Sequence, residues 1–205
     1  MPRYSKKQRQ ALQRMMQEDV CRVAGDILRQ EGSCALTMDR IACEIGVSRA
    51  TLYNYFADRD AVLTCIDARL LTPLMERLEA IAAGLEAAPQ RLEAMIFAVL
   101  HWVSHEDPDF LRALHPVEGL GEARMAAKMT LRDRALAAFE TVIRQGVAAG
   151  ELRDLPPARV SEIVLGALTG LIETMKFRRQ FLPPEEVVPP LVAVLLGGLK
   201  QKETP

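Results

Sequence analysis

Several features that would narrow the function of this 205-residue chain are missing from it. No run of roughly eighteen uncharged apolar residues occurs, so no segment should cross a membrane as a helix. The N-terminus is polar and basic and lacks the apolar core of an export signal, which predicts a cytoplasmic protein. The sequence also contains no G-x-S-x-G nucleophile motif, no P-loop and no G-x-G-x-x-G. We therefore expect a protein that is not an enzyme, with no catalytic residues and no cofactor.

The chain also lacks an overall positive charge. Its 26 Lys and Arg residues are balanced by 27 Asp and Glu, for a net charge of −1, so total charge does not predict nucleic-acid binding. The distribution is informative, because residues 1–14 hold only basic charges, at Arg3, Lys6, Lys7, Arg9 and Arg14. Such an arm can follow a DNA phosphate backbone or enter a minor groove, and we count Lys6 and Lys7 among the DNA-binding candidates. A solvated tail is the alternative.

Cysteine is scarce, and its placement argues against a disulfide framework. Cys21, Cys34, Cys43 and Cys65 all lie in the first third of the chain, and no two form a Cys-x-x-Cys pair. In a reducing cytoplasm such residues usually stay as thiols. We interpret them as small buried hydrophobic residues, with redox sensing through one of them as the alternative.

What the chain has in abundance is helix-forming residues with apolar side chains at three- to four-residue spacing. This pattern predicts an all-α fold with helices at residues 8–30, 38–45, 49–55, 58–85, 90–104, 108–116, 119–149, 157–180 and 185–199. Pro73 lies inside the helix predicted at 58–85, where it should cause a kink or a break. That bend is either a hinge that transmits a signal or a static feature.

The segment from Thr37 to Arg59 predicts a helix-turn-helix. Thr37 can cap a first short helix, and Gly46 can end it by adopting positive φ. Ser48 can cap a second helix that starts at Arg49 and reaches about Tyr55. Two helices joined by a four-residue turn place the second helix in a DNA major groove. An ordinary helical hairpin is the alternative.

The exposed side chains of this segment suit DNA. We predict base contacts from Arg49, Thr51 and Asn54, which carry donors or acceptors able to reach base edges. Phosphate contacts are predicted from five further residues, namely Thr37, Ser48, Tyr53, Tyr55 and Arg59.

The segment reads T-x-x-x-I-A-x-x-x-G-V-S-x-x-x-x-Y-x-Y-F-x-x-R, and in this pattern it resembles the DNA-binding domain of TetR-family transcriptional regulators. Arg59 departs from the family, which usually has Lys there; both cations can hold a phosphate, Arg through a fork and Lys as a point charge. The resemblance implies a DNA-binding domain at residues 1–56 and a ligand-binding and dimerisation domain at residues 57–205, connected by the helix at 58–85. It also implies a homodimer and an inducer pocket.

The last two predicted helices are apolar on more than one side and need cover on both. A second subunit would supply it, through a four-helix interface that also presents two recognition helices to a pseudo-palindromic operator. Our interface candidates are Val164, Leu168, Leu171, Leu191 and Leu195.

A ligand pocket is predicted in the C-terminal domain from its aromatic, histidine and methionine side chains, which can form an adaptable apolar cavity with a few polar tips. The candidates are Phe97, His101, Trp102, His105, Phe110, Met125, Met129, Phe139 and Met175. Each of them can equally be plain core.

A metal site is a weaker alternative in the same region. His101 and His105 have the i, i+4 spacing that can bind zinc, with a third ligand from His115, Glu106 or Asp107. Because no glutamate of a hydrolytic motif lies between the histidines, we expect no metal.

Together these patterns predict a dimeric, sequence-specific DNA-binding regulator, in its simplest form a repressor released from its operator by a small, largely apolar ligand. Two alternatives stay open. One is a helical protein-interaction module that does not bind DNA. The other is a metal- or redox-responsive regulator that uses His101 and His105 or the cysteines.

Overall fold

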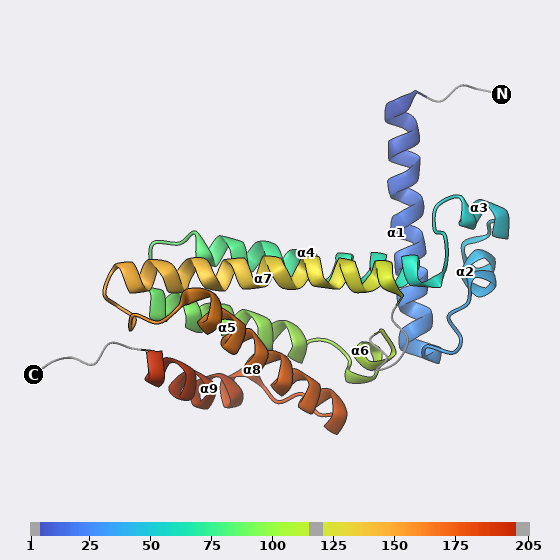
Figure 1. The fold of residues 1–205 in the computed structure, drawn as a ribbon. Helices are drawn as coiled ribbons and strands as arrows, with labels where there is room; N and C mark the ends of the chain where they lie inside the picture. Colours follow the sequence, from blue (N-terminus) through green and yellow to red (C-terminus); the bar gives the residue numbers. More distant parts are fainter. Residues whose placement is uncertain (1–4, 115–120, 200–205) are drawn as a thin grey trace, which may run out of the picture. The chain divides into compact units, whose positions relative to one another are not determined.

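The residues that the computed structural model describes, 5–114 and 121–199, form helices joined by loops (Figure 1). No strand occurs in these ranges, and the predicted all-α class is confirmed. The helices are α1 Lys6–Glu31, α2 Met38–Ile45, α3 Arg49–Tyr53, α4 Arg59–Ala82, α5 Ala88–Ser104, α6 Pro108–Leu114, α7 Glu122–Ala148, α8 Pro157–Arg178 and α9 Pro184–Leu199.

Internal contacts divide the chain into two compact units. Unit 1 combines the chain up to Leu70 with Asp109–Ala127, and unit 2 combines Leu71–Pro108 with the chain from Lys128 onward. Each unit therefore contains part of α4 and part of α7, which run through both as continuous helices. The domain boundary predicted after residue 56 stays a prediction, because a division by contacts does not test which segments fold independently.

Unit 1 is built on the apolar stripe of α1. Val20, Ala24 and Leu28 are almost fully buried, and α2 packs against this helix. The helix begins at Lys6 because Ser5 and Gln8 form a capping box, in which the Ser5 hydroxyl accepts from the Gln8 N–H at 3.2 Å. The basic arm is therefore helical from Lys6 on; Arg3 lies outside the described residues.

A buried ion pair joins α4 to α7 within unit 1. Nε and Nη2 of Arg124 donate to Oδ2 of Asp67 at 3.2 and 3.1 Å, and the two side chains are 1% and 3% exposed. Arg124 also donates to the carbonyl of Leu114 at the end of α6. Removal of either partner would leave a buried charge uncompensated, which typically costs about 3–5 kcal/mol.

The helix α4 continues through Pro73. Of the kink or break that we predicted at this position, the break does not occur. Proline removes one backbone hydrogen bond, but the surrounding helix remains packed through buried residues such as Leu74 and Leu78. At its end, Nη1 of the buried Arg91 donates to the Ala82 carbonyl at 2.9 Å and to Gln145 Oε1 at 2.6 Å. This positive side chain satisfies a terminal carbonyl and links α4 to α7.

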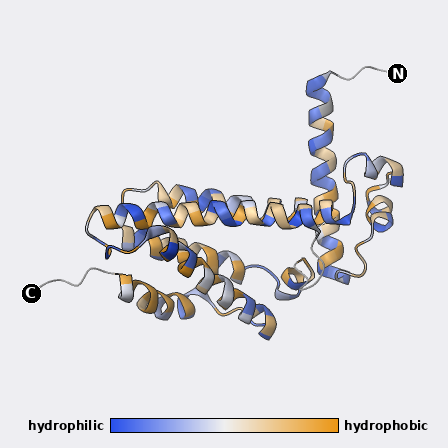
Figure 2. Cartoon of the chain, viewed as in Figure 1, coloured by the Kyte–Doolittle hydropathy of each residue, from blue (hydrophilic) through white to orange (hydrophobic). Residues whose placement is uncertain are grey.

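Unit 2 packs around α5, whose residues Leu92, Met95 and Ile96 are completely buried. The helices α8 and α9 both contact α5, and the apolar faces of the unit 2 helices are visible in Figure 2. Close packing is required at Gly146, where a Cβ would lie 2.5 Å from the Cβ of Ala88. A larger residue there would push α7 away from α5.

The cysteines differ from our interpretation. Cys21 of α1 and Cys65 of α4 are joined by a disulfide, whereas Cys34 and Cys43 are exposed free thiols. Of the four, only Cys21 is buried as a small hydrophobic residue would be. Spacing along the chain cannot reveal a pair of cysteines separated by 44 positions on two helices that pack together.

None of the helices in the described residues combines the length and apolar character required to cross a membrane.

Candidate nucleic-acid interface

The turn between α2 and α3 has the geometry that the sequence predicted. The Thr37 hydroxyl caps α2 by accepting from the Arg40 N–H at 3.1 Å. Gly46 ends the helix with φ of 76°, in the left-handed region that glycine adopts without strain. Val47 then donates to the Ala42 carbonyl at 3.0 Å, which fixes the direction in which the chain enters α3.

The short helix α3 is held by buried apolar side chains and capped at its start. Leu52 is fully buried, Phe56 just after the helix is 4% exposed, and α3 packs against α2. The Ser48 hydroxyl accepts from the Thr51 N–H at 3.1 Å and lies 2.8 Å from the Thr51 hydroxyl. Both hydroxyls therefore have a structural partner in addition to their predicted contacts with DNA.

The side chains that remain free to meet a partner are Arg49, Tyr53 and Asn54, all exposed. Arg49 lies over the Tyr53 ring at 5.5 Å from its centroid, and its Nη1 is 3.1 Å from Oδ1 of Asp39. The hydrogen bond to Tyr53 and the charge of Asp39 raise the pKa of Arg49, which is a cation in any case. Since exposed ion pairs contribute only about 0–1 kcal/mol, Arg49 can exchange these partners for a base or a phosphate at small cost.

Two of the phosphate candidates are less accessible. Tyr55 is half-buried. Arg59 donates from Nη2 to the Ser33 carbonyl at 2.8 Å, and its Nε is buried without a hydrogen-bond partner. Arg59 thus holds the loop before α2, and a phosphate contact from it would require this side chain to turn outward.

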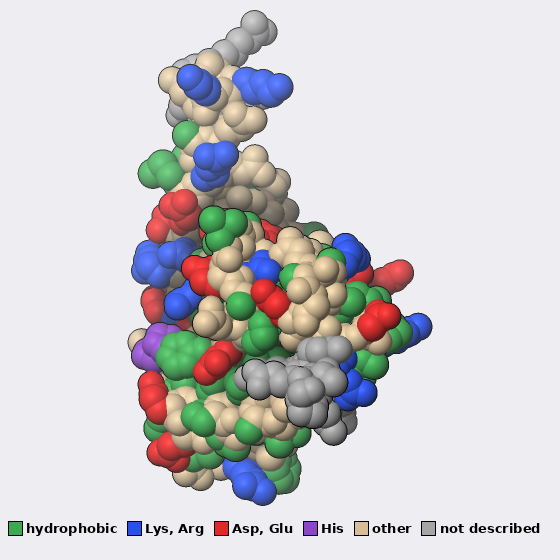
Figure 3. Space-filling view, turned by 90° about the vertical axis from the view of Figure 1, so that its left-hand side faces the viewer, with side chains coloured by type: hydrophobic (Ala, Val, Ile, Leu, Met, Phe, Trp, Pro, Cys, Tyr) green, Lys and Arg blue, Asp and Glu red, His purple; other side chains and the backbone are tan. Residues whose placement is uncertain are grey.

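The basic start of α1 extends the charged surface of unit 1. Lys6 and Lys7 are exposed in the first turn, and the first acidic residue of the helix is Glu18. Figure 3 shows Lys and Arg side chains around this end of the helix. Cations at a helix N-terminus oppose the macrodipole and slightly destabilise the helix. A local arrangement that disfavours folding is typical of a functional segment.

The nine predicted ligand-binding residues are divided between the two units, and their role in binding a ligand stays a prediction. Phe110 and Met125 belong to unit 1, where Phe110 is buried beneath the Arg29 guanidinium and Met125 is 45% exposed. In unit 2, Met129 is 46% exposed, whereas Phe139 and Met175 are buried in the core. Phe97 and Trp102 of α5 are half-buried against that core. Helical periodicity could place these residues on helices but could not show which faces meet.

Phe97 and His101 of α5 and His105, which follows the helix, form a row of neighbouring rings. The ring centroids of Phe97 and His101 are 5.5 Å apart and those of His101 and His105 are 4.1 Å apart. His105 Nδ1 lies 2.7 Å from the His101 carbonyl oxygen. Within the described residues no group of three or more His, Cys, Asp or Glu side chains could hold a metal ion, and His115 lies outside them.

Comparison with known proteins decides the family. Residues 22–64 match the profile described as bacterial regulatory proteins, tetR family, and residues 86–173 match the tetracyclin repressor-like C-terminal domain. The chain belongs to the TetR family. It is a DNA-binding regulator, as the helix-turn-helix predicted, and members of the family are in general not enzymes.

Individual relatives of this TetR-family chain are distant. The nucleoid occlusion factor SlmA of Vibrio atlanticus is 27% identical over 161 residues, which cover 76% of this chain and 79% of SlmA. A TetR/AcrR-family regulator from Thermobifida fusca is 24% identical with a TM-score of 0.70, covering 90% of this chain and 98% of its own. FadR from Bacillus subtilis, solved with stearoyl-CoA, is 16% identical with a TM-score of 0.74, covering 88% and 98%. The two structures show a shared fold.

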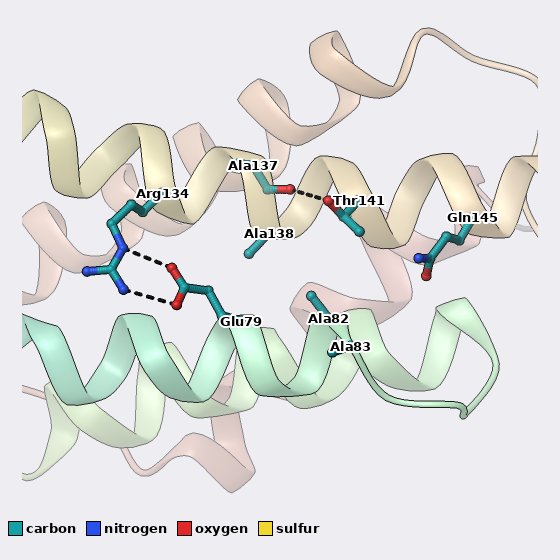
Figure 4. Close-up of a pocket in the computed structure, with 8 residues that line it drawn as sticks. All are labelled: Glu79, Ala82, Ala83, Arg134, Ala137, Ala138, Thr141 and Gln145. Atoms are coloured by element: carbon teal, nitrogen blue, oxygen red, sulfur yellow. Dashed lines mark hydrogen bonds and ion pairs between the residues drawn. The ribbon is translucent and has the colours of Figure 1, made fainter.

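In the TetR-family C-terminal part, a shallow hollow of about 440 Å³ lies between α4 and α7 within unit 2 (Figure 4). Its walls are four alanines, Ala82, Ala83, Ala137 and Ala138, with Thr141 and Gln145 toward one end. At the other end Arg134 bridges to Glu79 through two hydrogen bonds of 2.8 and 3.0 Å, which hold the pKa of Glu79 below its usual value. None of the nine predicted ligand-binding residues lines this hollow.

The role of the five predicted dimer residues stays a prediction, and the structure places two of them in the core of the protomer. Val164 and Leu168 are 1% exposed and belong to the core of the protomer, while Leu171, Leu191 and Leu195 are half-buried. The exposed apolar residues are Ile163 and Phe177 of α8 and Val194 of α9, at 64%, 88% and 76%. The sequence did not distinguish them because both helices are apolar on more than one side, and only the packing onto α5 shows which face is the inner one.

Proposed function

We propose that this TetR-family regulator is a homodimeric repressor that binds a pseudo-palindromic operator and is released from it by a small, largely apolar ligand. The observation that carries the proposal is the helix-turn-helix, in which buried anchors and caps leave Arg49, Tyr53 and Asn54 exposed along one short helix. The DNA-binding function is that of the family; the residue roles, the symmetry, the ligand and the direction of regulation are our proposals.

Base contacts are assigned to Arg49, Thr51 and Asn54 of the segment that enters the major groove. Phosphate contacts are assigned to Thr37, Ser48, Tyr53 and Tyr55, with Arg59 after rotation of its side chain, and to Lys6 and Lys7 of α1. Because phosphate contacts release counterions, affinity should fall steeply with added salt. Selectivity should depend on the few base contacts.

A second copy of the chain is the proposed cover of α8 and α9. On α8, Ile163, Gly166, Gly170 and Phe177 are all exposed, and their spacing of three, four and seven residues puts them on one face. A side chain at Gly166 or Gly170 would meet no atom within 4 Å, so this face is open in the protomer. Small residues beside large apolar ones let two helices approach closely, and an exposed apolar face of this kind is typical of an interface.

The proposed ligand acts through unit 2. FadR, which shares the fold, was solved with stearoyl-CoA, and the half-buried Phe97 and Trp102 keep apolar surface near the core of unit 2. A ligand lowers DNA affinity only if it binds more tightly to a conformation in which the two recognition helices do not match the operator. His101, His105, Met129, Phe139 and Met175 stay candidates in unit 2, whereas Phe110 and Met125 belong to unit 1.

Selection of operator DNA tests the proposal. The purified full-length protein is mixed with fragmented genomic DNA, bound fragments are sequenced, and the Arg49→Ala/Tyr53→Ala double variant serves as the control. We expect an enriched inverted repeat that the double variant does not select. The proposal fails if the wild type enriches no sequence at low salt, or if the double variant enriches the same one.

A further inference from the structure

The disulfide between Cys21 and Cys65 joins two helices of unit 1 that the DNA-binding function uses. Cys21 lies in α1, which carries the basic N-terminal turn, and Cys65 lies in α4, which follows the helix-turn-helix directly. Figure 1 shows α1 passing beside the first turns of α4. The Cα atoms of the two cysteines are 6.2 Å apart, within the range that a disulfide spans without movement of the backbone.

A small cleft of unit 1 opens onto Cys21. It has a volume of about 150 Å³, and its other lining residues are charged (Arg22, Asp26, Arg29 and Arg69) or apolar (Gly25, Ile66, Leu70 and Phe110). A water molecule occupies about 30 Å³ of the liquid, so the cleft has room for a molecule as small as a peroxide. Cys65, the disulfide partner of Cys21, is half-buried.

The charges around the cleft favour a reactive thiol. Three guanidinium groups face one carboxylate among its lining residues, and positive charge stabilises the thiolate, which is the form that reacts. Arg22 and Arg29 have carboxylate partners at 3.3 and 3.7 Å, and Arg69 donates to the Glu18 carbonyl at 3.3 Å.

We propose that Cys21 and Cys65 are a redox-reactive thiol pair, which a peroxide converts to the disulfide that ties α1 to α4. The Cys21 thiolate attacks the peroxide O–O bond, which forms a sulfenic acid and releases water or an alcohol once the leaving oxygen takes a proton. The Cys65 thiolate then attacks the sulfenic sulfur, which forms the S–S bond and releases water. Two thiols lose two electrons and two protons, and the peroxide is reduced by the same two electrons; a dithiol reverses the reaction.

The location of the pair connects its redox state to DNA. A protein that binds the cell's DNA works where thiols are kept reduced, and a disulfide in such a place is usually transient and redox-sensing. The bond fixes α1 against α4, the two helices on either side of α2 and α3 in the sequence. Its formation therefore changes the operator affinity; this step rests on the proposed function, whereas the thiol chemistry does not.

Peptide mapping tests the chemistry without DNA. The full-length Cys34→Ser/Cys43→Ser variant keeps only the pair; it is reduced, treated with graded hydrogen peroxide, alkylated, digested and analysed by mass spectrometry. We expect the Cys21 and Cys65 peptides to become linked within one protomer, lighter by two hydrogen atoms, and to separate again with dithiothreitol. In the wild type at the same dose, the exposed Cys34 and Cys43 should still be alkylated. Earlier oxidation of these two thiols, or absence of the linked peptide, would overturn the proposal.

The operator affinity of the reduced and oxidised forms tests the regulatory step. We expect a change of at least about fivefold in the variant that keeps the pair, and none in the same variant with Cys65→Ser added. Equal affinity of the linked and reduced forms would overturn the regulatory step alone. If the wild type selected no operator at all, the assigned DNA-binding function would fail while the thiol chemistry would stand, because the linked peptide is detected without DNA.

Discussion

The sequence predicts the helix-turn-helix accurately, but it does not predict which faces of the last two helices are buried. In α2 and α3, Thr37, Gly46 and Ser48 mark where each helix begins or ends, and Leu52 marks the buried side. In α8 and α9 apolar residues occupy more than one face, and no polar pattern shows which of these faces is buried. Caps and tight turns are local chemistry that the sequence displays directly, whereas the choice between two apolar faces depends on what packs against them.

We expect the largest difference between two substitutions that place a charge on the two apolar faces of α8. Leu168→Asp would place an unpaired charge in the core of unit 2, where Leu168 is 1% exposed, and should unfold the protomer or destabilise it by several kcal/mol. Ile163→Asp changes a residue that is 64% exposed and should leave the protomer folded but monomeric.

Circular dichroism on urea unfolding and sedimentation velocity distinguish these results. A folded dimer of the Ile163→Asp variant would exclude the proposed interface. A Leu168→Asp variant as stable as the wild type would mean that α8 packs with another face inward.

Substitution of Arg49 tests the role of α3, whose start and buried side the sequence predicted. Arg49→Ala should weaken binding to the selected operator by about 1–3 kcal/mol and relax the base preference at the position it contacts. Arg132→Ala is a matched control, because Arg132 is an exposed arginine of α7 in unit 2. Titration of both variants with operator and scrambled DNA measures the effect. Unchanged affinity and base preference in Arg49→Ala would show that the recognition residues lie elsewhere.

Two glycines should respond in opposite ways to the same substitution. Gly46→Ala forces a side chain into φ of 76° and should cost about 1–2 kcal/mol of unfolding free energy. Gly166→Ala in the middle of α8 meets no atom of the protomer and should make the isolated protomer more stable by up to about 1 kcal/mol.

In the dimer, however, an added methyl group at Gly166 should weaken association, since it separates two close helices. Unfolding midpoints measured at low and high protein concentration separate the two contributions. If Gly166→Ala stabilised the protein equally at both concentrations, α8 would not approach a partner at this glycine.

The smallest effect is expected at the start of α1. Lys6→Gln/Lys7→Gln should reduce the slope of log affinity against log salt by up to about 2, because each lost phosphate contact removes roughly 0.9. The same change should stabilise α1 slightly, since two cations no longer oppose its dipole. Affinity measured between low and moderate salt, with the unfolding midpoint as a second measurement, checks both. An unchanged slope would show that Lys6 and Lys7 do not contact phosphates.

Local patterns in the chain were enough to predict the all-α class, the helix-turn-helix with its caps, and most helix ends to within a few residues. These depend on interactions between residues three or four positions apart, which any local reading of the chain can detect. The helical start of the basic arm at Lys6 was missed by a small margin, because a capping box fixes the first turn. The helix predicted at 58–85 runs through Pro73 without the break that was one alternative.

Only the tertiary structure decided which residues meet across long distances in the sequence. It buried Val164 and Leu168, exposed Ile163, distributed the predicted pocket residues over both units, and joined Cys21 to Cys65. Each of these outcomes depends on how apolar faces of different helices pack together. Several packings bury similar apolar area, and the hydrophobic effect is non-directional, so shape complementarity between whole helices chooses among them.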